Sequence, residues 1–373
     1  MTLCELMAKS DKVLRPLLNS ISPAFAVKVY STGRKLFIKM LSNESIDGRL
    51  HSSPELSRKL WNLEFGTPLF NAAGMFKYGE GYDTVYRQGA GAYLCGTSTF
   101  QQREGNSKDG VVHPFVSYPK SASASNWMGL PNHGHSYLAA AVNRINKKPG
   151  CPIGVSISTN PEHTGDEALN GVIEGLHIFQ ATQADFIELN ESCPNVAHEC
   201  EIDSASGLDL SLIRRLQAIS SEFLRHRSRN LPVIVKFSND TDVRLVPKLI
   251  DILLNCGFDG ANFGNTSTDY DVLRPMVNDR DKPTFDYFTS TFGGGVSGAV
   301  LKKKSFTLCY AAMSHLNSLE LPREFHVIRT GGIESFDDIE QSERIGVAMN
   351  QWFTGYFEAF AENGHHLYDK LFN

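Results

Sequence analysis

The sequence predicts an α/β protein whose main part is a (β/α)8 barrel of the TIM type, preceded by an N-terminal helical extension. Eight short apolar runs recur from residue 68 onward, and each ends in Gly, Ser, Thr or Asn. Apolar runs without alternation are typical of parallel strands buried on both faces, and eight strands close such a barrel. An open doubly wound sheet normally has a GxGxxG turn after its first strand, and no such turn follows the first run.

The expected elements follow from this pattern. Strands are predicted within residues 68–74, 91–97, 152–158, 186–192, 232–238, 260–266, 325–332 and 350–355. Apolar residues at helical spacing predict helices within 166–182, 208–227 and 243–257. The connections 98–134 and 267–302 are long for a compact domain, and we expect them to act as lids or binding loops.

Residues 1–41 differ from the rest of the chain in charge. They carry seven basic and two acidic residues, whereas the whole chain has a net charge of -5. Basic helices with an apolar face suit an anionic membrane surface. A pair of helices packed on the main domain with a solvated basic face is the alternative, and the sequence leaves both open. We therefore divide the chain into an extension at 1–60 and a barrel domain at 61–373.

Composition argues against several classes of protein. The net charge of -5 gives no indication of nucleic-acid binding. No apolar run reaches the ~18 residues of a membrane-spanning helix, and the N-terminus lacks the apolar core of a signal peptide. Seven scattered cysteines without a CxxC pair favour free thiols in a reducing compartment. We expect a cytoplasmic protein, peripheral on the inner face of the membrane if residues 1–41 bind it, and the oligomeric state stays open.

The carboxyl ends of the strands carry the chemistry in a barrel of this type. Residues at or just beyond these ends are rich in carboxamides, lysines and glycines: Lys77, Thr97, Asn190, Cys193, Lys236, Asn265, Thr266, Gly331, Gly332 and Thr354. Carboxamides offer donors and acceptors together, which suits a planar, amide-rich ring, and a lysine suits an attached carboxylate. Clusters of His or carboxylates are lacking at these positions, so no metal site is expected.

Two further features bear on a ligand. Lys236 lies within the apolar run "PVIVKFS", and a lysine inside a barrel requires an anionic partner, because an unpaired buried ammonium is costly. Glycine-rich turns at 292–298, 329–335 and 353–355 accompany the last strands, where TIM barrels bind phosphate. Their backbone N–H groups suit a phosphorylated cofactor such as FMN.

These segments resemble the dihydroorotate dehydrogenase family, the FMN enzymes of pyrimidine synthesis. The resemblance covers roughly residues 60–373, in order and without large gaps. Its most specific motifs are "NAAGMFKYGE", "REGN", "NWMGLPN", "ELNESCPN", "IVKFSND", "NFGNTS", "GGGVSG" and "RTGGIES".

The resemblance implies a role for each matching position. Cys193 matches the catalytic base, Lys236 the lysine at the flavin edge, and Lys77 the lysine near the substrate carboxylate and the flavin. Contacts to dihydroorotate or orotate are implied for Lys77, Asn126, Met128, Gly129, Leu130, Asn190, Asn195, Asn265 and Thr266. Contacts to FMN are implied for Ala73, Gly74, Thr97, Asn190, Lys236, Ser297, Gly298, Gly331, Gly332, Phe353 and Thr354.

The motifs mix two branches of this family. "ELNESCPN" and "NWMGLPN" resemble the soluble class 1 enzymes, which use a cysteine base and reduce fumarate or NAD. "GMFKYGE", "CGTSTFQQREGN" and the N-terminal extension resemble the class 2 enzymes, which reduce quinone at a membrane. Ser117 stands about where class 2 enzymes have an arginine, and Phe353 where they have a tyrosine. Arg329 replaces a small residue, and nothing in the sequence explains it.

We therefore expect a dihydroorotate dehydrogenase that uses FMN and quinone. The class 1 feature, the cysteine base, can arise by one substitution, whereas the class 2 feature, the N-terminal extension, requires many changes. Fumarate or NAD is the alternative acceptor. A related flavin barrel that reduces dihydropyrimidines is a second alternative. A barrel that only binds a nucleotide or a membrane is a third, and the presence of both Cys193 and Lys236 argues against it.

Overall fold

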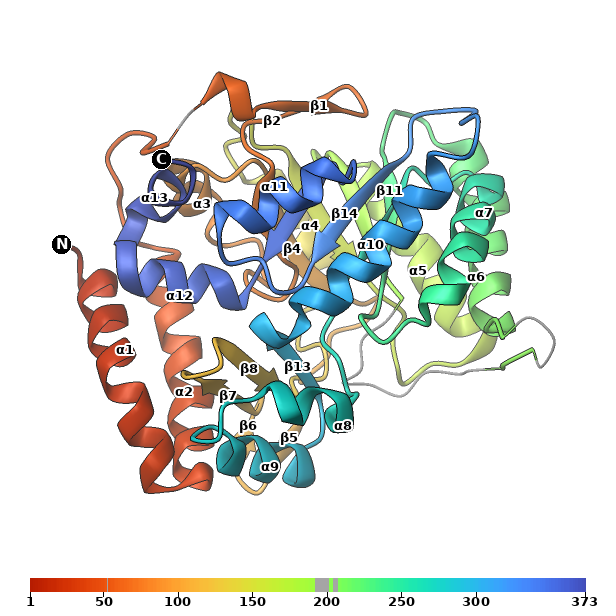
Figure 1. The fold of residues 1–373 in the computed structure, drawn as a ribbon. Helices are drawn as coiled ribbons and strands as arrows, with labels where there is room; N and C mark the ends of the chain where they lie inside the picture. The colour runs from red at the N-terminus through yellow and green to blue at the C-terminus, as the bar shows by residue number, and fades with distance from the viewer. Residues whose placement is uncertain (52, 192–200, 204–206) are drawn as a thin grey trace.

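The centre of the computed structural model, which describes residues 1–51, 53–191, 201–203 and 207–373, is a sheet of eight parallel strands (Figure 1). Their order around the sheet is β3, β15, β14, β12, β11, β10, β9, β4. The strands are β3 (Leu69–Asn71), β4 (Tyr93–Ser98), β9 (Ile153–Ile157), β10 (Phe186–Asn190), β11 (Val233–Phe237), β12 (Gly260–Phe263), β14 (His326–Thr330) and β15 (Met349–Trp352). Each overlaps one of the predicted runs, so the predicted barrel is confirmed.

The barrel closes between β3 and β4 through a side chain. Asn71 Nδ2 donates to the carbonyl oxygen of Leu94 at 2.7 Å, and Asn71 Oδ1 accepts from the Leu94 N–H at 3.2 Å. The Gly91 N–H adds a bond of 3.0 Å to the Leu69 carbonyl oxygen. Because all strands run in one direction around this cylinder, their carboxyl ends share one rim.

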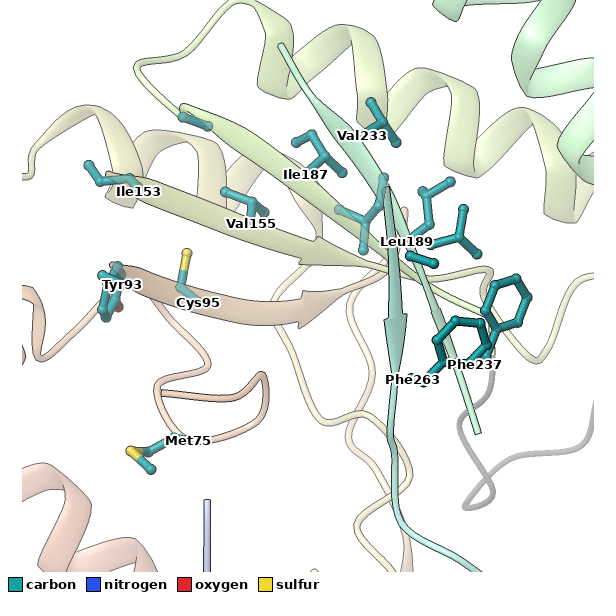
Figure 2. Packing of buried hydrophobic residues seen from close by; sticks show 14 of the residues in the cluster. Met75, Tyr93, Cys95, Ile153, Val155, Ile187, Leu189, Val233, Phe237 and Phe263 are labelled. Atoms are coloured by element: carbon teal, nitrogen blue, oxygen red, sulfur yellow. The ribbon is translucent and has the colours of Figure 1, made fainter. Parts of the chain in front are cut away.

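Side chains on each strand alternate between the barrel interior and the surrounding helices. On β10, Phe186 belongs to the apolar cluster inside the barrel, whereas Ile187 and Leu189 belong to the cluster shared with the helices (Figure 2). Successive residues of a strand point to opposite sides, so Glu188 and Asn190 face inward like Phe186. Glu188 and Asn190 therefore lie between the apolar cluster inside the barrel and the rim at the carboxyl ends of the strands.

Helices cover the outside of the barrel. They are α3 (Tyr82–Gln88), α4 (His135–Asn143), α5 (Gly165–Gln180), α6 (Leu210–Glu222), α7 (Val246–Cys256), α10 (Lys302–Leu316), α11 (Phe336–Arg344), α12 (Thr354–Asn363) and α13 (Leu367–Phe372). The helices predicted within 166–182, 208–227 and 243–257 correspond to α5, α6 and α7. The second is shorter than predicted because Phe223, at φ −125° and ψ −58°, leaves the helical conformation.

The two long connections are not structureless. Residues 98–134 contain β5 (Ser107–Lys108), β6 (Val111–Val112), β7 (Phe115–Tyr118) and β8 (Ser123–Asn126), and residues 267–302 contain α8 (Tyr270–Leu273), α9 (Lys282–Thr291) and β13 (Gly295–Gly298). Strands β13, β8 and β7 form an antiparallel sheet in that order. The pairing brings Asn126 opposite Gly295 and places both connections together.

A hairpin and two helices complete the chain. The hairpin of β1 (Arg58–Leu60) and β2 (Leu63–Phe65) supplies apolar side chains to the barrel interior. Helices α1 (Leu3–Ile21) and α2 (Pro23–Leu41) lie side by side at one edge, against β7 and α12 (Figure 1). Among the described helices, none combines the length and the apolar character needed to cross a membrane.

Residues 1–41 pack on the main domain, as one of the two alternatives predicted, and they also expose apolar side chains. One face of the helix pair packs on the rest of the protein, with Ala26, Val27 and Leu41 fully buried. Another face leaves apolar residues exposed: Leu3, Leu6, Val13, Leu14, Leu17, Ile21, Phe25 and Leu36. The extension is therefore docked on the barrel and still presents an apolar surface.

Candidate active site

The rim at the carboxyl ends of the strands surrounds a cavity that opens to solvent. Most residues with a role implied by the resemblance line it: Ala73, Gly74, Lys77, Thr97, Asn126, Met128, Leu130, Asn190, Lys236, Asn265, Thr266, Ser297, Gly298, Gly331, Gly332, Phe353 and Thr354. Gly129 lies between two of them and does not itself line the cavity. Cys193 and Asn195 lie outside the described residues.

A row of polar side chains crosses one side of the cavity. Asn265 Nδ2 donates to Asn190 Oδ1 at 3.0 Å, and Asn190 Nδ2 donates to Thr97 Oγ1 at 3.3 Å. Thr97 Oγ1 lies 2.9 Å from Ser156 Oγ. Thr266 Oγ1 is buried and has no hydrogen-bond partner within the described parts of the chain. This side can therefore offer donors and acceptors to a polar ring.

The opposite end of the cavity is built from glycine turns and a helix start. Gly332 has a φ of +72°, and a Cβ there would lie 2.5 Å from Lys302 Cα, so the close approach of the two segments requires glycine. Ser297 Oγ and Thr354 Oγ1 lie 2.9 Å apart beside this turn, and Thr354 begins α12. The unpaired backbone N–H groups and the dipole of a helix N-terminus favour an anion.

Lys236 of β11 lies inside the barrel and lines the cavity, and it is 4% exposed. Its Nζ lies 3.3 Å from Glu188 Oε1 and 3.3 Å from Gln351 Oε1. The anionic partner that the sequence required therefore comes from β10, and the ammonium still lines the cavity. A fixed cation at this depth can stabilise negative charge on a ligand.

Lys77 reaches the cavity from the segment after β3. Glu80 holds that segment, because its carboxylate accepts the backbone N–H of Lys77 at 3.2 Å and of Tyr78 at 2.7 Å. Gly96, on β4 at the other side of this segment, has a φ of +98°, and a Cβ there would lie 2.5 Å from the Ser156 carbonyl oxygen. The backbone at Gly96 thus leaves no room for a side chain, whereas Lys77 lines the cavity.

Arg329, which the sequence left unexplained, has a structural role beside the cavity. Its guanidinium is fully buried and donates to Ser305 Oγ at 2.9 Å and to Ser342 Oγ at 3.1 Å. It also donates to the carbonyl oxygens of Lys302 (2.9 Å) and Asp338 (3.3 Å). Arg329 therefore ties β14 to α10 and α11, the helices that follow two of the glycine turns.

A second cavity lies between the helix pair and the barrel. Its lining is largely apolar and includes Met7, Ala8, Val29, Phe37, Phe115 and Phe357. Phe353 and Thr354 line both cavities, so the two spaces meet at the start of α12. The helix pair thereby places an apolar chamber directly behind the rim.

A few polar groups line this second cavity. Arg15 pairs with Asp11 at 2.8 Å and with Glu358 of α12, and burial raises the pKa of Asp11. Tyr30 Oη and Arg34 Nε are buried without hydrogen-bond partners among the described residues. Burial also lowers the pKa of Arg34 to about 10. Ser117 lines the cavity where an arginine was expected for class 2, and here the arginines come from the helices instead.

Sequence reasoning missed part of the site. Glu188, Thr330 and Gln351 form the polar floor with Lys236, and Thr330 and Gln351 line the cavity. A signal was present, because "FIELN" and "NQW" place polar residues within apolar runs. Their mutual contact could not be predicted, since they come from three different strands.

The sequence matches a known family over most of its length. The sequence model of the family described as "Dihydroorotate dehydrogenase" matches residues 55–371. A "Dihydroorotate dehydrogenase (quinone)" of a Nitratiruptor species is 28% identical over 320 residues, which cover 86% of this chain and 81% of that protein. A protein of the same name from a Chelativorans species is 26% identical over 346 residues, covering 92% and 86%.

Solved structures show the same fold. The ligand-free DHODH of Eimeria tenella superposes with a TM-score of 0.73 at 22% identity, covering 91% of this chain and 93% of that one. The complex of DHODH from Eimeria tenella with ferulenol gives a TM-score of 0.72 at 20% identity, covering 91% and 89%. The likeness includes most of the chain and therefore the barrel as a whole.

Proposed function

The chain belongs to the dihydroorotate dehydrogenase family, and we propose from its own residues how it oxidises dihydroorotate to orotate in pyrimidine synthesis. The observation that carries the proposal is the set of groups that line one cavity. Carboxamides, Lys236, and glycine turns with the start of α12 all line the same space. Together they suit an amide-rich ring, a redox cofactor and a phosphate.

The residues present fit FMN. Gly331, Gly332, Ser297, Gly298 and Thr354 would hold its phosphate, since the glycine turns and the start of α12 present backbone N–H groups and two hydroxyls. Ala73, Gly74, Thr97, Asn190, Lys236 and Phe353 would line the ring system. When bound, FMN supplies the acceptor for the hydride that leaves C6 of dihydroorotate.

The substrate is bound by the carboxamide side of the cavity. Asn126, Asn190, Asn265 and Thr266 can pair with the ring amides, and the Thr266 hydroxyl is available because no described residue occupies it. Lys77 can neutralise the carboxylate. Met128 and Leu130 add apolar contact, and Asn195 is proposed as a further carboxamide from the sequence alone.

Cys193 is proposed as the base that removes the C5 proton. In the sequence it lies three positions after Asn190, the last residue of β10. The thiolate is the reactive form, with a pKa near ~8.5 for a free thiol. The proton leaves C5 on the face of the substrate opposite the cofactor, so the proposed base has to act from that face.

The second cavity supports quinone as the acceptor. It is apolar, it adjoins the first cavity at Phe353 and Thr354, and the buried polar atoms of Tyr30 and Arg34 that lack partners among the described residues suit the carbonyl oxygens of a quinone. Fumarate and NAD are polar molecules, so a largely apolar cavity does not suit their binding. The exposed apolar face and basic residues of 1–41 would let the protein lie on an anionic membrane, the source of an apolar acceptor.

The test is a two-step spectroscopic experiment with the purified full chain. Flavin absorbance should be present, should bleach when dihydroorotate is added without oxygen, and should return with a short-chain quinone faster than with fumarate or NAD. Absence of flavin, or no bleaching, would reject the assigned reaction. Faster recovery with fumarate or NAD would reject the quinone and leave the dehydrogenase in place.

A further inference from the structure

Glu188 is a fully buried carboxylate inside the barrel, and the function proposed above gives it no role. It lies on β10 two residues before Asn190, on the inward face of the strand. Its Oε1 lies 3.3 Å from Lys236 Nζ. Its Oε2 accepts from Asn262 Nδ2 at 2.8 Å and from Gln351 Nε2 at 2.7 Å.

The donors that surround Glu188 fix its position. Both carboxylate oxygens lie against N–H donors. The donors come from β11, β12 and β15, and Thr330 of β14 completes the group with bonds of 2.9 Å to Asn262 Oδ1 and Gln351 Oε1. The carboxylate therefore cannot turn away from Lys236 without leaving several buried donors unpaired.

The pair as a whole is neutral, and this matters for the cofactor site. An isolated ammonium at the cavity floor would attract negative charge on any ligand above it. The Glu188 carboxylate reduces that attraction and, together with Gln351, holds the Lys236 ammonium between β10 and β15. Two-electron reduction of a flavin ring adds negative charge to it, so the charge of the floor affects the reduced form more than the oxidised form.

We propose that Glu188 is a positioning residue that sets the reduction potential of the bound flavin through Lys236. It holds the ammonium at the cavity floor and offsets part of its charge, which keeps the reduced cofactor a stronger electron donor than a lone lysine would allow. The inference rests on the proposed function, because it requires FMN above Lys236.

Three variants test the charge of the floor: Glu188→Gln, Lys236→Met and the combination of both. The floor becomes positive in the first and negative in the second, and it is neutral again in the third. The midpoint potential of the bound flavin should therefore be highest in Glu188→Gln and lowest in Lys236→Met, with the wild type and the double variant between them. Relative to oxidised FMN, reduced FMN should bind Glu188→Gln about ten-fold more tightly than it binds the wild type.

Asp259→Asn is the matched control. Asp259 is a mostly buried carboxylate with its own cation, Arg227, at 2.6 Å, and it lies at the amino-terminal end of β12, away from the cavity. Its substitution should leave the flavin potential unchanged. A potential that shifts equally in Asp259→Asn and Glu188→Gln would overturn the proposal, because both effects would then reflect general damage to the barrel.

Thermal unfolding of the apoproteins provides a readout that does not need FMN. Lys236→Met leaves a buried carboxylate without its cation, so it should unfold at a lower temperature than the double variant. A double variant that is no more stable than Lys236→Met would overturn the pairing. If Glu188→Gln does not fold, the potential of the double variant still has to exceed that of Lys236→Met.

The outcomes separate this inference from the proposed function. If the wild type binds no FMN, the proposed function fails, and the thermal comparison still tests the pair. If FMN binds and dihydroorotate reduces it, but the potentials do not follow the predicted order, only the role of Glu188 is rejected. A purely structural Glu188 would lower stability in Glu188→Gln without changing the ratio of the two FMN affinities.

Discussion

Ser297 Oγ and Thr354 Oγ1 lie 2.9 Å apart, although one residue belongs to β13 in a long connection and the other begins α12. The contact joins the small antiparallel sheet to the barrel at the point where the glycine turn of Gly331 and Gly332 also lines the cavity. Burial raises the pKa of Glu334, which lies on the same rim and pairs with Lys302 at 3.4 Å. An anion at this point thus meets hydroxyls, backbone N–H groups and a carboxylate that is paired with Lys302.

Thr354→Val should weaken FMN binding without changing the fold. The substitution removes one hydroxyl from the proposed phosphate site, and hydrogen bonds to charged groups contribute about 1.5–3 kcal/mol. We therefore expect the Kd for FMN, measured by fluorescence titration of the apoprotein, to rise about ten-fold or more. Thr289→Val is the control. It removes a hydroxyl that donates to the Phe285 carbonyl oxygen on α9, and this variant should bind FMN normally. Equal affinity in the wild type and Thr354→Val would place the phosphate elsewhere.

Asn265→Ala should weaken binding of the substrate ring. Asn265 donates to Asn190 at 3.0 Å and accepts the backbone N–H of Thr266 at 2.8 Å, so it orders the carboxamide side of the cavity. Loss of its hydrogen bonds should raise the Kd for orotate about ten-fold, measured by the change in flavin absorbance on titration. Asn230→Ala, which removes a bond to the Trp61 carbonyl oxygen away from the rim, should leave orotate binding intact. The assignment fails if orotate binds both variants alike.

Cys193→Ala should keep FMN and orotate binding but slow flavin reduction by dihydroorotate at least about 10²-fold, the usual contribution of a positioned base. In the wild type the rate of reduction should rise with pH as the thiol ionises. Cys193→Ser should keep partial activity with a higher pH optimum, since a hydroxyl is harder to ionise. Stopped-flow reduction across pH measures all three proteins. A wild-type rate in Cys193→Ala would remove Cys193 from the chemistry.

The eight strands were predictable because each is a local apolar run in the sequence. Such a run can be identified without knowing which other strand it pairs with. The rim residues were predictable for the same reason, since a polar residue directly after a buried run marks a strand end, as for Asn190 and Thr97. The family resemblance then supplied the remaining positions, including Ser297 and Phe353.

Contacts between distant segments were not predictable. The sequence requires an anion for Lys236 but does not identify Glu188, because their contact depends on how the neighbouring strands β10 and β11 pair. The second cavity could not be predicted either, because Tyr30 and Phe353, which both line it, lie at opposite ends of the chain. Arg329 remained unexplained for the same reason, since its partners lie on α10 and α11.

Arg329→Met should destabilise the barrel while leaving it assembled around the same cavity. The substitution leaves buried acceptors on Ser305, Ser342 and two carbonyl groups without their donor, which should cost on the order of 3 kcal/mol of unfolding free energy. Urea unfolding followed by circular dichroism measures the change. Arg344→Met, which removes a mostly exposed side chain paired with Glu340 on the same helix, is the control and should change stability by less than about 1 kcal/mol. Equal midpoints for the two variants would contradict the role of Arg329.

The exposed apolar face of α1 should carry membrane binding. Val13, at 77% exposure, lies next to Leu14 and one turn from Leu17, and none of the three lines the cavity behind the helix. Leu14→Glu combined with Leu17→Glu should abolish binding to anionic liposomes in a flotation assay, because it places charge on the surface that inserts. Turnover with a soluble dye should be unchanged, whereas turnover with a quinone held in the liposomes should fall. Val272→Glu, a comparably exposed apolar site on α8, should bind like the wild type.

High salt should weaken binding of the wild type to the liposomes, since each basic residue contributes about 1 kcal/mol at such a surface. If the intact protein does not float with anionic liposomes, the helix pair serves only as a cover for the barrel.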